Sequence, residues 1–148
     1  MYNTVLVPLD GSKRAETILP HIEDIALRYK AKVIFLSVIE QPHTVVAPDG
    51  IYIPPQDVLD QQQIETEKYL KGQQKNFITD GVDATICIAN GRVVDEIIRV
   101  AEEENADLIA MASHGRSGLA RVFYGSVAAG VLNRIDRPLL LVRAEDDD

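Results

Sequence analysis

The chain has 148 residues, the usual size of a single domain. Its formal net charge of −8 argues against a nucleic-acid-binding protein, because such proteins gain much of their affinity from basic side chains that neutralise phosphates. No stretch approaches the roughly 18 apolar residues that a membrane span needs. The start "MYNTVLVPLD" lacks the cationic segment and cleavage site of a secretory signal, so we expect a cytoplasmic protein.

Five apolar segments are predicted to be β-strands. Four of them are continuous apolar runs, a pattern typical of parallel strands that helices cover on both faces. The third, "DATICIA", alternates more and is predicted to lie nearer an edge of the sheet. In chain order the five segments are residues 3–9, 32–39, 83–89, 106–112 and 138–144.

Helical patterns separate these strands. Residues 15–29 carry an amphipathic stripe, and Pro20 within it is predicted to kink the helix or to cost a backbone hydrogen bond. Residues 57–79 are polar with only a sparse apolar stripe, so we expect a largely exposed helix there. Residues 94–101 place their apolar side chains on one face, and a short helix of small residues follows Gly125.

This order of elements predicts one α/β domain over residues 1–144, followed by an acidic tail at 145–148. Right-handed crossovers would join the strands into an open five-stranded parallel sheet with helices on both faces. The expected strand order is 3-2-1-4-5. The proline-rich stretch 41–56 is either a lid over a site or a plain excursion between the second strand and the second helix.

In such a sheet the ligand site lies at the carboxyl ends of the strands, where the strand order reverses. The reversal falls between strands one and four, which end in "VPLDGS" and "MASHG". Asp10 is therefore predicted to be a hydrogen-bond acceptor at the mouth of a crevice. The opposite wall would be the glycine-rich stretch "MASHGRSGLARVFYGSVAAGVL".

Two interpretations of that glycine-rich stretch remain open from the residues alone. As a phosphate cradle, Gly125 lets the backbone approach a ligand and Ser126 opens a helix whose free N–H groups and dipole attract anions. Arg116 and Arg121 could then neutralise charge. As a plain turn, the stretch uses glycine and serine only because turns and helix N-caps favour them. It is not a Walker P-loop, because the GK[ST] ending is absent.

The chain resembles the universal stress protein family along nearly its whole length, and the matching stretches are "VLVPLDGS", "GRVVDEIIRVAEEENADLIAMASHGRSGL" and "GSVAAGVLNRIDRPLLLVR". The ATP-binding branch of that family carries the pattern G-x2-G-x9-G-[ST]. This chain has Ala112-x2-Gly115-x9-Gly125-Ser126, so only the first glycine is replaced. If that position needs a positive φ, the methyl group of Ala112 is strained; if it needs only a small side chain, alanine serves.

The resemblance implies a Rossmann-like fold of the adenine nucleotide alpha hydrolase type and an ATP site. Asp10 would meet the adenine or the ribose, and Val38 would contact the adenine through its backbone. Met111 and Ala112 would line the ribose side, and the glycines and Ser126 would hold the phosphates. The residues so implied are Pro8, Asp10, Val38, Met111, Ala112, Gly115, Gly125, Ser126 and Val127.

Plainer interpretations stand beside these assignments. Asp10 can instead form an Asx turn before Gly11, and Val38 and Met111 can be ordinary core residues. His114 has no visible nucleophile or orienting carboxylate, so no catalytic residue is predicted. His43 and Asp49 lack the spacing of metal ligands, and Cys87 has no CxxC partner and is predicted to face the core.

The preferred function is therefore a nucleotide-responsive stress module that binds ATP, accompanied by Mg²⁺ without a dedicated protein cage. The fifth strand contains "LLLV", apolar on both faces yet expected at an edge, and the resemblance implies that a second copy covers it in a homodimer. Neither a nucleic acid nor a membrane is an expected partner. The alternatives are a slow ATPase or self-phosphorylating protein, a nucleotide-free dimerisation module, and an AMP or cyclic-nucleotide sensor.

Overall fold

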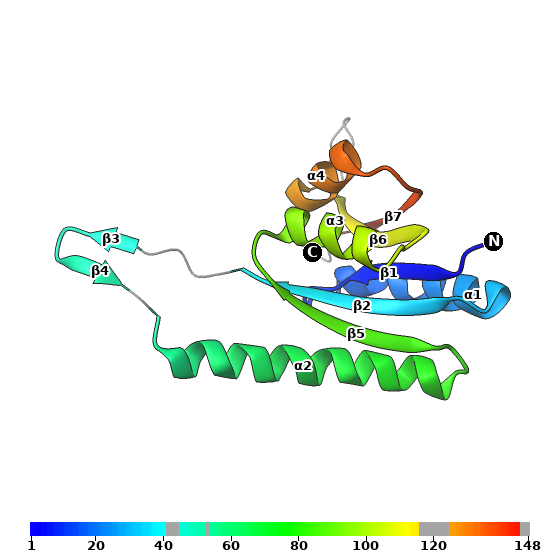
Figure 1. The fold of residues 1–148 in the computed structure, drawn as a ribbon, viewed down its shortest axis with the longest axis horizontal. Helices are drawn as coiled ribbons and strands as arrows, with labels where there is room; N and C mark the ends of the chain where they lie inside the picture. Colours follow the sequence, from blue (N-terminus) through cyan, green and yellow to red (C-terminus); the bar gives the residue numbers. More distant parts are fainter. Residues whose placement is uncertain (41–44, 53, 116–124, 146–148) are drawn as a thin grey trace.

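The structure, a computed structural model, describes residues 1–40, 45–52, 54–115 and 125–145. Its main sheet holds five parallel strands in the order β5-β2-β1-β6-β7 (Figure 1). Numbered among themselves, these strands follow the predicted order 3-2-1-4-5, and the third and fifth lie at the edges as expected. Their bounds are Thr4–Pro8 for β1, Lys32–Ile39 for β2, Ala84–Asn90 for β5, Leu108–Gly115 for β6 and Leu139–Glu145 for β7.

Two layers of helices cover the sheet, each over its own core. The 3₁₀ turn η1 (Ala15–Ile18), α1 (Leu19–Tyr29) and α2 (Gln56–Thr79) pack on the face that receives Val5 and Val7. Helices α3 (Val93–Glu103) and α4 (Ser126–Arg134) pack on the face that receives Leu6. Alternate residues of β1 therefore enter opposite cores, which is why the strand is apolar throughout rather than alternating.

Pro20 neither kinks a helix nor removes an internal hydrogen bond, contrary to the prediction. The amphipathic stripe of residues 15–29 is divided into the 3₁₀ turn and an α-helix that begins afresh at Leu19, so Pro20 lies in the first turn of α1. A proline costs little there, because the first N–H groups of a helix have no acceptor within it.

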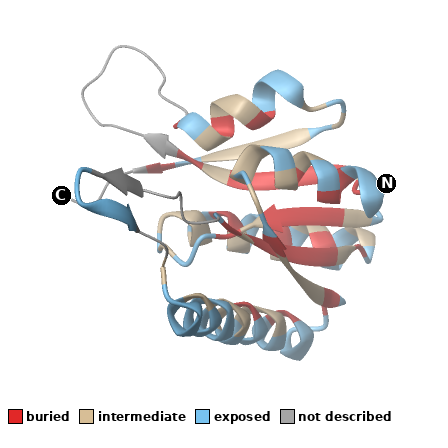
Figure 2. Cartoon of the chain, turned by 60° about the vertical axis from the view of Figure 1, so that its left-hand side comes forward, coloured by how far each residue is buried: buried red, intermediate tan, exposed pale blue. Residues whose placement is uncertain are grey.

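The exposed helix and the proline-rich stretch lie outside the compact layers. Only Leu70 and Phe77 of α2 are buried, and Figure 2 shows most of the helix surface facing solvent, as predicted. Within the proline-rich stretch, β3 (Val45–Ala47) and β4 (Gly50–Tyr52) form an antiparallel hairpin that stands apart from the main sheet in Figure 1. Its described part is therefore an excursion rather than a cover over the strand ends.

The chain terminus and the helix lengths bear on two further expectations. Strand β7 includes Glu145, the first residue assigned to the acidic tail, and residues 146–148 lie outside the described residues. In the part of the chain that the structure describes, no helix is both long and apolar enough to cross a membrane.

Helices α3 and α4 approach closely at Gly130. A Cβ atom at this position would lie 2.7 Å from Cγ2 of Val94, well inside van der Waals contact. The Arg134 guanidinium pairs with the Asp95 carboxylate and adds a second link between the helices. Glycine at this point therefore sets how near α4 lies to α3, and so fixes the position of the amino end of α4.

We predict that Gly130→Ala destabilises the protein by about 1–2 kcal/mol, because overlap with the stiff Val94 side chain costs more than the helix propensity gained from alanine. Urea unfolding measures the change. In a Val94→Ala background the same substitution should cost less, since the overlapping methyl group is gone. A Gly130→Ala variant as stable as the parent would contradict this account of the helix contact.

Candidate functional site

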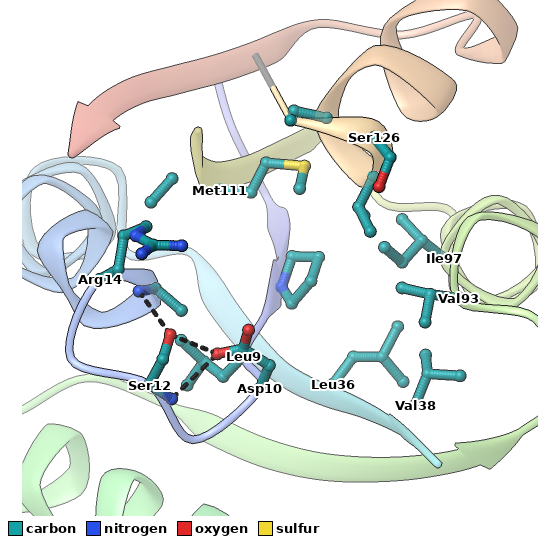
Figure 3. A pocket seen from close by; sticks show the side chains of 16 residues that line it. Leu9, Asp10, Ser12, Arg14, Leu36, Val38, Val93, Ile97, Met111 and Ser126 are labelled. Atoms are coloured by element: carbon teal, nitrogen blue, oxygen red, sulfur yellow. Dashed lines mark hydrogen bonds between the residues drawn. The ribbon is translucent and has the colours of Figure 1, made fainter. Parts of the chain in front are cut away.

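A cavity of about 210 Å³ opens at the carboxyl ends of the strands, at the reversal of strand order between β1 and β6 (Figure 3). These two strands pair only through Val5 with Leu108 and Leu6 with Ile109. Beyond that point β6 continues beside β7, whereas β1 stays with β2 through the hydrogen bond from Leu9 N–H to the Leu36 carbonyl. The cavity occupies the fork that results.

Pro8 explains why the fork forms at this position. Because Leu9 donates its N–H toward β2, the alternation of a parallel strand directs the backbone groups of Leu6 and Pro8 toward β6. Proline has no N–H to donate, so the ladder cannot continue there. The sequence therefore ends β1–β6 pairing at Pro8, a residue that lines the cavity.

The structure brings nearly all of the predicted site residues to this one cavity. Gly115 is the exception, because it ends β6 opposite Glu145 and does not contribute to the described lining. The predicted residues that line the cavity are Pro8, Asp10, Val38, Met111, Ala112, Gly125, Ser126 and Val127.

Sequence reasoning missed several lining residues. Ser12 and Arg14 lie two and four residues after Asp10, so their closeness to a strand end was the available signal. Ile97 was assigned to a core-facing helix stripe, and nothing in that stripe distinguishes the turn nearest the strand ends. The lining residues not predicted are Leu9, Ser12, Arg14, Ala15, Leu36, Val93, Ile97 and Ala128.

The cavity has an apolar side and a polar side. Figure 3 shows Leu36, Val38, Val93 and Ile97 together on one side, contributed by β2 and α3. On the other side lie Asp10, Ser12 and Arg14, from the segment that follows β1, with Met111 and Ser126 along the upper margin between the two sides. Such a cavity suits a flat apolar group joined to a polar one.

A short turn fixes the Asp10 carboxylate. Its Oδ1 accepts hydrogen bonds from the Ser12 backbone N–H at 2.9 Å and from the Ser12 hydroxyl at 2.6 Å. The same hydroxyl oxygen accepts the Ala15 N–H at 3.1 Å and so joins the turn to η1. The plainer interpretation of Asp10 as a turn-forming residue is therefore observed, and the same carboxylate also lines the cavity.

The amino end of α4 forms another part of the wall. Gly125 caps the helix with φ at 78° and ψ at 159°, a conformation that favours glycine. The first hydrogen bond from the helix to this cap runs from Ala129 N–H to the Gly125 carbonyl at 3.0 Å. The N–H groups of Ser126 and Val127 precede that bond and have no acceptor within the helix, so they are suited to an anion.

Ala112 is not strained. It lies within β6, paired with Val142 of β7, and it is absent from the non-glycine residues of positive φ, which are Lys30 and Asn105 in the described chain. The backbone at this position therefore does not require glycine, and Ala112 forms part of the cavity wall.

The electrostatic environment beside Asp10 is negative. Tyr69 of α2 has its pKa raised above the usual range, first by burial and then by the nearby carboxylates of Glu16 and Asp10. The phenol is thus neutral at physiological pH, and the two acidic groups exert their field on this side of the strand ends.

The remaining candidates do not form a second site in the described part of the chain. Cys87 is half-buried against the α3–α4 core, and burial raises the pKa of its thiol. Asp49 is exposed in the hairpin turn, and among the described residues no group of three acidic, histidine or cysteine side chains could hold a metal. His43, Arg116 and Arg121 lie outside the described residues, as does the His114 side chain.

Comparison with known proteins shows which family this chain resembles in sequence. The sequence model of the universal stress protein family matches residues 1–143. The chain is 31% identical to universal stress protein YxiE of Bacillus subtilis, over 97% of this chain and 100% of the relative. It is 25% identical to universal stress protein MJ0577 of Methanocaldococcus jannaschii, over 99% and 98% of the two chains.

Solved structures show the same fold. The MJ0577 structure matches with a TM-score of 0.82 and 27% identity, covering 99% of each chain. A universal stress protein in complex with cAMP matches with a TM-score of 0.68 and 24% identity, over 97% and 98% of the chains. The universal stress protein from Archaeoglobus fulgidus in complex with dAMP matches with a TM-score of 0.63 and 19% identity, over 95% of this chain and 97% of the other.

Proposed function

Because the chain belongs to the universal stress protein family, we propose that it is a cytoplasmic, nucleotide-responsive stress module that binds ATP in the cavity between the ends of β1 and β6. One observation carries the proposal: a single cavity presents an apolar side, a fixed carboxylate and the amino end of a helix. These three features match the three parts of a nucleoside phosphate.

The proposed orientation follows from the two sides of the cavity. The adenine lies against Leu36, Val38 and Ile97, where burial of its ring is favourable. The Asp10 carboxylate accepts from the ribose hydroxyls with the lone pairs that Ser12 leaves available. The phosphates meet the N–H groups of Ser126 and Val127 at the start of α4.

The size of the cavity fits part of such a ligand. Small-molecule sites commonly enclose about 300–1,000 Å³, whereas the described walls enclose about 210 Å³. The base and ribose would occupy this volume, and the phosphates would extend past the start of α4. Solved proteins of the same fold hold cAMP and dAMP, which supports an adenine ligand.

We propose binding rather than rapid turnover as the activity. Both Ser12 donors already engage Oδ1 of Asp10, so this carboxylate acts first as part of a turn. Mg²⁺ would be held mainly by the phosphates, since it commonly binds through substrate phosphates and retained waters.

The test is calorimetric titration of nucleotide-free protein with ATP, ADP, AMP and cAMP, together with acid release of any nucleotide that co-purifies. We expect ATP to bind. The Gly125→Val substitution should lower the affinity for ATP by at least about 30-fold, because a β-branched residue at φ of 78° displaces the amides that hold the phosphates. The matched control is Gly81→Val, which has a comparable positive φ of 94° in the turn between α2 and β5, away from the cavity.

Gly81→Val should lose stability but keep its affinity for ATP. Preferential binding of AMP or cAMP would replace the ATP proposal with a mononucleotide sensor. Absence of binding to all four nucleotides, or equal ATP affinity in Gly125→Val and the parent, would contradict the proposed site.

We also propose that β7 pairs with a second copy of the chain. Leu139, Leu140, Leu141 and Val142 are each only half-buried at the edge of the sheet. An apolar edge strand exposed to solvent favours association, so a two-fold partner would protect it. Sedimentation equilibrium should give twice the mass of one chain at micromolar concentration, and the mass of a single chain at that concentration would contradict the dimer.

A further inference from the structure

Arg14 gives the cavity a positive charge that the sequence did not reveal. Of the described residues that line the cavity, Arg14 is the one cationic side chain and Asp10 the one anionic side chain. Figure 3 shows Arg14 on the polar side, opposite Val93 and Ile97 and away from the apolar wall. A ligand whose base rests on that wall would direct its polar end toward this guanidinium.

The backbone of Arg14 is held firmly. Its carbonyl accepts hydrogen bonds from the Thr17 hydroxyl at 2.8 Å and from the Thr17 N–H at 3.2 Å. The Ser12 hydroxyl oxygen accepts the N–H of Ala15, the next residue, within the turn that also fixes Asp10. The Asp10 carboxylate and the backbone of Arg14 are therefore held by one short, hydrogen-bonded segment. Arg14 also has an interaction partner within the protein.

The surroundings of Arg14 are negatively charged. The chain carries a net charge of −8, and the carboxylates of Asp10 and Glu16 lie close enough to Tyr69 to add to the rise in its pKa that burial causes. The start of α4 offers only about half a positive charge. Each phosphate added to a nucleoside increases the repulsion from these carboxylates, so a cationic side chain, beside any Mg²⁺ held by the phosphates, would favour a polyphosphate.

A guanidinium is well suited to that task. It is charged at any physiological pH, and its planar set of N–H donors matches two oxygens of a phosphate group. The start of α4 and Arg14 belong to different walls of the cavity, so they can hold different parts of a phosphate chain.

We propose that the Arg14 guanidinium binds the phosphate chain and makes the cavity selective for adenosine di- and triphosphates over adenosine and its monophosphate. This inference rests on the proposed nucleotide-binding function. It assigns the selectivity to a residue that lies outside the glycine-rich stretch.

The experiment compares the affinities of ATP, ADP, AMP and adenosine for four proteins: the parent, Arg14→Met, Arg14→Lys and Arg28→Met. The last variant is the matched control, because Arg28 is an exposed arginine of α1 that lies over the Tyr29 ring and not in the cavity. It removes the same charge from the chain as a whole. Each titration is repeated at low and high salt.

Arg14→Met should lower the affinity for ATP about 10- to 100-fold, as expected for loss of a charge-assisted hydrogen-bonding pair. The affinity for adenosine should change by less than about twofold. Its ATP affinity should also depend less on salt. Arg14→Lys should restore part of the loss, and Arg28→Met should behave as the parent. Retained adenosine binding shows that the cavity of Arg14→Met is still folded.

Equal fold-losses of affinity for ATP and adenosine would assign Arg14 a structural role and overturn the inference, as would an ATP affinity that is unchanged in Arg14→Met. Both results leave the nucleotide site itself intact. A parent protein that binds none of the four ligands would instead overturn the proposed function, and this inference with it.

Discussion

The early separation of β1 from β6 is the constraint on which the candidate site depends. The two strands share only two residue pairs before Pro8 removes the next donor, and each then continues beside its outer neighbour. A sheet that stayed paired to its edge would leave no space between the strand ends. The cavity is thus a consequence of backbone hydrogen bonding, and the surrounding side chains determine what it can hold.

The two faces of the sheet contribute different chemistry to that space. From the α3 side come the apolar side chains of Val93 and Ile97, which continue the core out to the edge of the sheet. From the α1 side comes the hydrogen-bonded segment of Asp10, Ser12 and Arg14. The close contact of Gly130 with Val94 holds α4 against α3, and this contact sets where the amino end of α4 meets the cavity.

The fold was predictable from the sequence because continuous apolar strands and amphipathic helices alternate along the chain. The division of the first helical segment was not predictable, because the apolar spacing of residues 15–29 continues unchanged from the 3₁₀ turn into the α-helix. Pro20 marks the start of the α-helix, but its position inside the apolar stripe suggested a kink or a lost hydrogen bond within one long helix. The hairpin of β3 and β4 was hidden by the prolines on either side of it.

The candidate site was predictable where it follows from strand ends and from family resemblance, as with Asp10, Val38 and Gly125. It was not predictable where a side chain is placed by tertiary packing. Ile97 looks like any core residue of α3, and Arg14 looks like an exposed charge near the start of a helix. Ala112 left two interpretations open in the sequence, and only its position within β6 excludes the strained one.

The most direct test of the account is nuclear magnetic resonance of the backbone amides of Ser126 and Val127 during titration with ATP and with adenosine. If the start of α4 holds the phosphates, both amide signals shift strongly with ATP and weakly with adenosine, whereas the methyl signals of Val38 and Ile97 shift with both ligands. Shifts of the two amides that are the same for ATP and adenosine, or methyl signals that do not respond, would contradict the proposed placement of the nucleotide.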